Sequence, residues 1–264
     1  MYTCWMAVLY AGEDKTLKRV ASPEKIVGKW KEVVDTIVET SKLHLDLHLI
    51  AIYIGGSVGT GMAKENKSDV DSYVVVDLSK DEIEQLYDAW VDEERRRIHR
   101  LFPFLRGVEI HFSPLNEMTE GRKFQLKVLS AHVYGKDISA RLPEYKLDKE
   151  TIGRIRVNVA KDLKKARREL SETTEKTKIQ RIGSWIAKRL IRSSGMLVLW
   201  KGNVFTMDIE PLVELLISHY PEQAQSVQTL LDYTNEAPTE KKEILCMLDV
   251  YGQWLVQEDR EVFG

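Results

Sequence analysis

The sequence predicts an α+β protein in which a small mixed sheet with flanking helices (residues 1–145) precedes a C-terminal helical bundle (residues 146–264). Two observations lead to this prediction. In the first part, short runs rich in β-branched and aromatic residues alternate with amphipathic segments of helical period. From about residue 148 onward no segment has a convincing strand pattern, and apolar residues recur every three or four positions. Mixed elements followed by helices alone are typical of a sheet layer with an added bundle.

The expected elements of the first part follow one another as helix, strand, loop, strand, helix, strand and helix. The first helix is expected to begin at Ser22-Pro23-Glu24, because serine is a favourable N-cap and proline is tolerated in the first turn. The apolar start of the chain, up to Gly12, is expected to form a buried strand or a loosely packed arm. The predicted helices cover residues 22–42, 81–101, 120–133, 149–170, 178–200, 208–219, 221–233 and 239–257, and the predicted strands cover 47–54, 72–78 and 106–112.

Composition excludes several classes of protein. The chain has 264 residues, 43% hydrophobic and 30% charged, with a net charge of −2, so no overall basic field points to nucleic-acid binding. No run approaches the roughly 18 apolar residues that a membrane span needs, and the start lacks the basic region of a signal peptide. Cys4 and Cys246 lie too far apart in sequence to indicate a zinc site or a disulfide framework. A cytoplasmic protein is therefore expected.

Two motifs around one polar loop carry the chemistry. The first predicted strand ends in Gly55-Gly56-Ser57, whose backbone N–H groups and hydroxyl are suited to holding an anion. Twelve positions after Ser57, Asp69-Val70-Asp71 opens the next strand, and alternate strand residues project from one face. Two neighbouring carboxylates repel each other unless a cation lies between them. This combination of anion cradle and metal pair is suited to a nucleoside triphosphate.

A third acid, Glu109, lies 38 positions after Asp71. The interval holds one strand, one long helix and the start of the next strand, so Glu109 is expected beside Asp71 on a neighbouring strand. Three carboxylates next to a phosphate-holding turn suit two-metal catalysis. The alternative is that Asp69 caps a turn while Asp71 and Glu109 are solvent-facing strand acids. His111 shares the face of Glu109 and is interpreted as a surface histidine.

Gly56-Ser57, the loop, Asp69-Val70-Asp71 and the later strand acid together resemble the signature of the polymerase-beta-like nucleotidyltransferases. The spacing to Glu109 and the following helices look most like aminoglycoside adenylyltransferases of the streptomycin/spectinomycin type. The signature covers about residues 50–112, and the helical half is similar only in outline.

The resemblance implies a nucleotidyltransferase catalytic domain at 1–145, a C-terminal helical domain at 146–264, and magnesium-dependent transfer of AMP from ATP to a hydroxyl of a small molecule. An aminoglycoside is the candidate acceptor, which would make the enzyme one of antibiotic resistance. Asp69 and Asp71 would bind Mg²⁺, and Gly56 and Ser57 would hold the β- and γ-phosphates. Glu109 matches the third acid, which either completes the metal site or acts as general base; both roles stay open.

The helical half offers further cations. Family members bring a basic side chain from this half to the triphosphate, and Lys188 and Arg192 are the candidates here. The equally basic run over 161–168 is the type that usually forms a solvated face. Where the streptomycin-type enzymes have lysine before the tail aspartate, this chain has Met207, a departure that bears on the triphosphate contacts and the acceptor. The residues considered for binding the amines of an acceptor are Trp185, Asp208 and Glu210, with Trp185 interpreted as core.

Two other functions are compatible with the same motifs. One is a regulatory or antitoxin-type nucleotidyltransferase that modifies a protein or RNA, although the minimal enzymes of that kind are much shorter. The other is a nucleotide sensor with a decayed site; the presence of all three acids argues against this alternative. The expected partners are a nucleoside triphosphate and a hydroxyl-bearing small molecule, with no membrane and no nucleic acid, and the expected state is monomer or homodimer.

Overall fold

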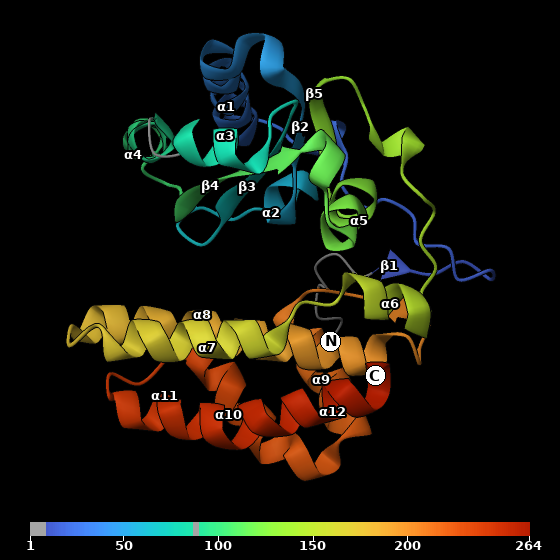
Figure 1. Cartoon of the computed structure of the whole chain (residues 1–264), viewed down its shortest axis with the longest axis vertical. Coiled ribbons are helices and arrows are strands. Elements are labelled where there is room, and N and C mark those ends of the chain that lie inside the picture. The colour runs from blue at the N-terminus through green and yellow to red at the C-terminus, as the bar shows by residue number, and fades with distance from the viewer. Residues whose placement is uncertain (1–8, 87–89) are drawn as a thin grey trace. The chain divides into compact units, whose positions relative to one another are not determined.

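The computed structural model describes residues 9–86 and 90–264 of the chain. The chain divides into two compact units, which are described separately. One unit covers Leu17–Tyr145 and contains the sheet, and the other combines Lys146–Gly264 with the segment before Leu17 (Figure 1).

The sheet is mixed and four-stranded, in the order β4-β3-β2-β5. Strand β2 is antiparallel to both β3 and β5, whereas β3 and β4 are parallel. A parallel pair needs a crossover between its strands, and the helices that follow β3 provide it. The strands are β2 (Leu49–Ile54), β3 (Asp69–Val76), β4 (Gly107–Pro114) and β5 (Ala131–Gly135). The predicted small mixed sheet with flanking helices is thereby confirmed.

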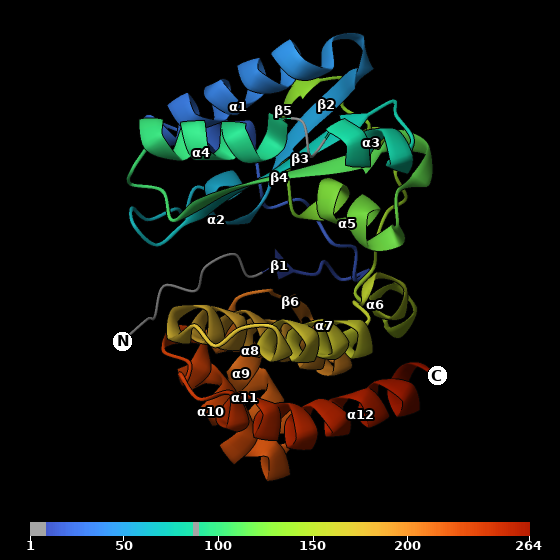
Figure 2. The same cartoon turned by 60° about the vertical axis from the view of Figure 1, so that its left-hand side comes forward.

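The two faces of the sheet differ in chemistry. Helices α1 (Lys29–Leu45) and α4 (Asp92–Leu101) cover one face, where Ile52, Val74 and Ile110 of the strands are fully or almost fully buried. Helix α5 (Glu120–Val128) lies on the other side of the sheet (Figures 1 and 2), whereas the one-turn helix α2 (Gly56–Gly59) follows β2 and contributes Val58 to the core on the side of α1 and α4. A smaller apolar cluster forms on the side of α5, so one end of this face remains available for polar side chains. Helix α3 (Lys80–Leu86) completes the unit.

The second unit is built around the long helix α8, which is mostly buried after Ile186 except at Lys188, Arg189 and Arg192. Its helices are α6 (Lys149–Ile155), α7 (Val159–Ser171), α8 (Lys176–Leu199), α9 (Ile209–His219), α10 (Ala224–Asn235), α11 (Lys241–Met247) and α12 (Gln253–Phe263). Short 3-10 turns cover Pro23–Lys25, Asp46–His48, Leu115–Glu117, Ser139–Arg141 and Pro221–Gln223, and a π-helical turn covers Leu248–Gly252. None of the described helices is both long and apolar enough to cross a bilayer.

Several predicted elements are wrong in their boundaries. The helix expected over 22–42 is interrupted, because Gly28 has a φ of +56° and α1 begins only after it. The helix expected over 81–101 consists of α3 and α4, and residues 87–89 lie outside the described part. The helix expected over 149–170 breaks before α7, where Asn158 caps the new start by accepting from the Lys161 N–H. The segment expected as one helix over 239–257 is α11, the π turn and α12.

Two strands were missed. The helix predicted over 120–133 ends at Val128, and Ala131–Gly135 forms β5 against β2 instead. The short strand β6 (Val204–Phe205) pairs with β1 (Leu9–Tyr10), so the expectation of no strand beyond residue 148 is wrong. Both pairings join segments far apart in the chain, which local periodicity does not reveal. The expected N-terminal strand is described only from Leu9 onward, and Cys4 lies outside the described residues, whereas Cys246 is an exposed free thiol.

Candidate active site

The turn after β2 is shaped by its two glycines. Gly56 has a φ of +60°, and a Cβ on it would lie 2.7 Å from Oδ2 of Asp71. A Cβ on Gly55 would lie 2.7 Å from Cε2 of Tyr73, and the Gly55 N–H donates to the Asp71 carbonyl at 2.9 Å. Only glycine permits this conformation and this approach, so the backbone of the turn is held directly against the Asp71 carboxylate.

Ser57 opens the loop that connects this turn to β3. Its Oγ donates to Ser68 Oγ at 3.0 Å, and Ser68 Oγ also accepts from the Lys64 N–H at 2.9 Å. Ser68 is buried and directly precedes Asp69. The hydroxyl of Ser57 is therefore fixed at the same end of the sheet as the first aspartate.

The three predicted acids lie on two adjacent strands. Asp69 and Asp71 are half-buried on the face of β3 opposite the buried Val70. The parallel register pairs Asp71 with Glu109 of β4 and Asp69 with Gly107. Glu109 thus lies directly beside Asp71, as expected from the interval between them.

Arginines accompany two of the acids, and sequence reasoning missed them. Arg106 forms an ion pair with the Asp69 carboxylate. Arg95 of α4 reaches round the edge strand, where its Nε donates to the Val108 carbonyl at 2.7 Å and its Nη2 donates to Glu109 Oε1 at 2.7 Å. Arg106 directly precedes β4, which is a weak sequence signal; nothing in the sequence singles out Arg95 among the arginines of its helix.

A stack of side chains continues the polar face. The Arg122 guanidinium of α5 lies over the Tyr73 ring at 4.3 Å, and the Tyr73 and His111 rings stack at 5.4 Å. Burial lowers the pKa of His111 to about 4, with further lowering by the charges of Arg122 and Arg95. The imidazole is therefore neutral at physiological pH, and the interpretation of His111 as a surface histidine is wrong because it is mostly enclosed.

The donor set is compatible with a divalent cation. Carboxylate oxygens are the ligands that Mg²⁺ prefers, and Asp69 and Asp71 offer them from one strand face beside the exposed backbone of Gly56. Across the ranges 9–86 and 90–264, no group of three His, Cys, Asp or Glu side chains is arranged to hold a metal ion. Asp69 and Asp71 are the pair that could hold such a cation.

The cations predicted from the helical half lie on α8. Lys188 and Arg192 are half-buried, and the Arg192 Nε donates to the Met207 carbonyl at 3.2 Å. The Arg192 charge also acts on Asp208, whose pKa burial nevertheless raises to about 6, with Glu210 adding to the rise. One oxygen of Asp208, Oδ2, is buried without a hydrogen-bond partner among the described residues. These groups form one charged cluster within the helical unit.

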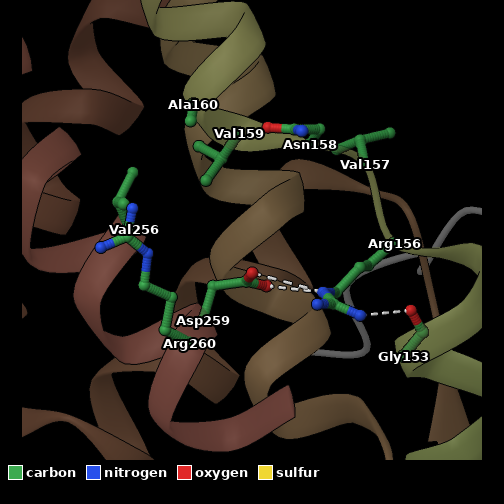
Figure 3. Close-up of a pocket in the computed structure, with 9 residues that line it drawn as sticks. All are labelled: Gly153, Arg156, Val157, Asn158, Val159, Ala160, Val256, Asp259 and Arg260. Atoms are coloured by element: carbon green, nitrogen blue, oxygen red, sulfur yellow. Dashed lines mark hydrogen bonds and ion pairs between the residues drawn. The ribbon is translucent and has the colours of Figure 1, made fainter. Parts of the chain in front are cut away.

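Other polar groups of this unit are already engaged. Arg189 forms an ion pair with Asp162 at 2.6 Å, and the Lys165 ammonium lies 4.9 Å from the centre of the Trp185 ring. A pocket of about 310 Å³ between the start of α7 and α12 holds the Arg156–Asp259 ion pair (Figure 3). None of the predicted site residues lines that pocket.

Comparisons with known proteins agree with the site in the sheet. The family model of the nucleotidyltransferase domain matches residues 15–134, which include the glycine turn and all three acids. Among solved structures, the fold is similar to that of a spectinomycin adenyltransferase from Enterococcus faecialis, solved with ATP and spectinomycin. The two chains are 14% identical, with a TM-score of 0.54 over 87% of this chain and 99% of that one. No curated protein matches the chain significantly.

Because the domain match contains the glycine turn and the aspartate pair, the predicted resemblance to polymerase-beta-like nucleotidyltransferases is confirmed. The structural match to the adenyltransferase covers 87% of this chain and so extends beyond the sheet-containing unit. The chain therefore contains a nucleotidyltransferase domain over residues 15–134, and its fold resembles that of an aminoglycoside adenylyltransferase.

Proposed function

We propose that this nucleotidyltransferase transfers AMP from ATP, with Mg²⁺, to a hydroxyl of a small molecule, and that an aminoglycoside is the acceptor class. The observation that supports this most is the juxtaposition of Asp71 with Glu109 in the strand register and with Gly56 in the turn. The adenyltransferase of similar fold was solved with ATP and spectinomycin, and this supports the choice of donor and acceptor.

In this proposal the donor lies against the glycine turn. The N–H groups at Gly56 and Ser57 and the Ser57 hydroxyl hold the β- and γ-phosphates. Asp69 and Asp71 hold Mg²⁺, which would neutralise charge on the phosphates and on the leaving group. Arg106 then exchanges its pairing with Asp69 for water, at little cost in free energy because about half of its side chain is exposed.

The transfer step makes one bond and breaks one. The acceptor hydroxyl oxygen bonds to the α-phosphorus, the bond from that phosphorus to the bridging oxygen of the β-phosphate breaks, and pyrophosphate leaves with the electron pair. The hydroxyl proton must go to a base near the attacking oxygen, and we assign this role to Glu109.

We assign the base role to Glu109, with Arg95 holding one oxygen of its carboxylate in place. The contact of Arg95 is with Oε1 of Glu109, at 2.7 Å. A carboxylate that is held by a guanidinium on one oxygen keeps the other oxygen available for a proton. With Glu109 assigned as the base, Asp69 and Asp71 alone supply the carboxylate ligands of the metal in this proposal.

We assign the helical unit to the acceptor and to part of the triphosphate. Lys188 and Arg192 are proposed to meet phosphate oxygens, and Asp208 with Glu210 to meet the amines of a cationic acceptor. The catalytic domain is taken as residues 1–145 and the helical domain as 146–264, although the strand pairing of β1 ties the first residues to the helical unit. The reaction is assigned to the cytoplasm and to a monomer or homodimer.

A direct assay tests the proposal. The protein is incubated with each labelled nucleoside triphosphate, Mg²⁺ and a panel of aminoglycosides, and pyrophosphate release is measured together with the mass of the acceptor. We expect ATP to give a gain of one AMP on one acceptor. Absence of turnover with every acceptor, together with absence of Mg²⁺-dependent ATP binding, would refute the enzymatic proposal.

A further inference from the structure

Arg122 is a half-buried cation on the catalytic face of the sheet, and none of the functions assigned above uses it. It lies in the first turn of α5, where its backbone N–H donates to the Thr119 side chain at 3.2 Å. Its guanidinium lies 4.3 Å from the centre of the Tyr73 ring. Burial lowers the pKa of Arg122, while Tyr73 and the charge of Asp71 act in the opposite direction.

The partners of Arg122 border the glycine turn. The Tyr73 ring approaches to 2.7 Å from where a Cβ on Gly55 would lie, and the Asp71 carboxylate approaches to 2.7 Å from where a Cβ on Gly56 would lie. The guanidinium stacks on the first of these side chains and is attracted by the second. The cation and the turn therefore belong to one continuous group of contacts, although α5 and the turn are more than 60 positions apart in the chain.

The balance of charge around Arg122 indicates which kind of ligand its guanidinium would bind. A guanidinium that is withdrawn from water needs an anionic partner, and the carboxylate that acts on Arg122 is that of Asp71. In the proposed function the same carboxylate binds Mg²⁺ and then neutralises Arg122 less well. A second anion beside Asp71 would restore the balance, and a phosphate group matches the planar donors of arginine in two parallel hydrogen bonds.

We propose that Arg122 binds the triphosphate of the donor nucleotide, as a cation supplied by the sheet-containing unit itself. This inference depends on the proposed function. Arg95 and Arg106 are less suited to the role because each makes a direct ion pair with another acid of the site.

The test is calorimetric titration of the full chain with ATP and Mg²⁺ in the absence of acceptor. Arg122→Met keeps the apolar stem over Tyr73 and removes the charge, whereas Arg122→Lys keeps the charge without the planar donors. We expect Arg122→Met to weaken ATP binding about 10- to 100-fold and to reduce the dependence of affinity on salt, with a smaller loss for Arg122→Lys. Arg97→Met is the matched control, because Arg97 is an arginine of the same unit that pairs with Glu94 and contacts Thr40 instead.

Each outcome has a definite meaning. ATP affinity within twofold of the wild type in Arg122→Met would overturn the inference and leave the proposed function intact. Weaker binding with an unchanged salt dependence would assign Arg122 to the fold and overturn the inference as well. If the wild type itself does not bind ATP, the proposed function fails and the inference fails with it. Should Arg122→Met not fold, Arg122→Gln, which also removes the charge, decides the question by the same two criteria, provided that its melting temperature is close to that of the wild type.

Discussion

Arg95 and Glu109 are joined round the edge of the sheet: Nη2 of the arginine donates to Oε1 of the glutamate at 2.7 Å, while Nε donates to the Val108 carbonyl. The arginine is thus fixed to the backbone of the strand that carries the glutamate. The contact sets the orientation of the carboxylate as well as its charge environment, and this matters for a group that must meet a hydroxyl proton within hydrogen-bond distance.

Replacing Arg95 should therefore affect turnover more than nucleotide binding. We expect Arg95→Met to lower kcat about 10- to 100-fold, because a catalytic group displaced by about 1 Å loses activity on that scale, while the KM for ATP changes little. Steady-state kinetics of pyrophosphate release measure both constants. Arg97→Met on the same helix is the control and should leave kcat unchanged; an equal loss in both variants would contradict the role of Arg95.

The glycine turn makes a prediction with a matched control. Gly56→Ala should abolish ATP binding and destabilise the fold by roughly 1–3 kcal/mol, because the new Cβ meets the Asp71 carboxylate at 2.7 Å and the residue must keep a positive φ. Gly28 has a similar φ of +56°, but a Cβ there meets nothing within 4 Å. Gly28→Ala should cost about 1 kcal/mol from backbone strain alone and retain ATP binding. Thermal unfolding of both variants measures the cost of backbone strain, and calorimetric titration measures whether the turn still binds ATP.

The aspartate pair should be indispensable. Asp69→Asn and Asp71→Asn remove the anionic metal ligands, and we expect pyrophosphate release to fall by on the order of 10³-fold or more in each. Their effects on stability should differ. Asp69→Asn loses only an exposed ion pair with Arg106, worth about 0–1 kcal/mol, whereas Asp71→Asn leaves the half-buried Arg122 without its carboxylate. Turnover that survived both substitutions would refute the metal assignment.

Asp208 makes the stability of the helical unit depend on pH. Burial raises its pKa from 3.8 in the unfolded chain to about 6, so the folded state binds the proton more tightly. The contribution of this group to the free energy of unfolding is therefore greatest below about pH 4, falls as pH rises to about 6, and is constant above. In denaturant unfolding between pH 4 and 7.5, the free energy of unfolding of Asp208→Asn should increase relative to that of the wild type as pH rises from about 4 to about 6. A difference between the two proteins that does not vary with pH would contradict the raised pKa of Asp208. Glu210→Gln should move the window to lower pH, because Glu210 contributes to the rise.

The sequence alone determined the parts of the protein that depend on local pattern. Alternating and helical periods identified three of the four strands of the sheet and the helical second half. The Gly56-Ser57 turn and the Asp69-x-Asp71 pair were recognisable because their chemistry follows from neighbours within one strand and one loop. The interval between Asp71 and Glu109 was long enough for one crossover, and this predicted their adjacency.

Tertiary structure decided what no local pattern contains. Segment 131–135 is a strand because β2 offers it an open edge, and Val204–Phe205 is one because Leu9–Tyr10 pairs with it. The partners of the acids could not be predicted either. Arg95 and Arg122 are two among many arginines until folding packs α4 on the sheet, so that Arg95 reaches round the edge strand, and α5 on its polar face. The physical reason is the same in each case. Strand pairing and charge pairing act between residues that are close in space, and their energies depend on distance and burial, which periodicity along the chain does not encode.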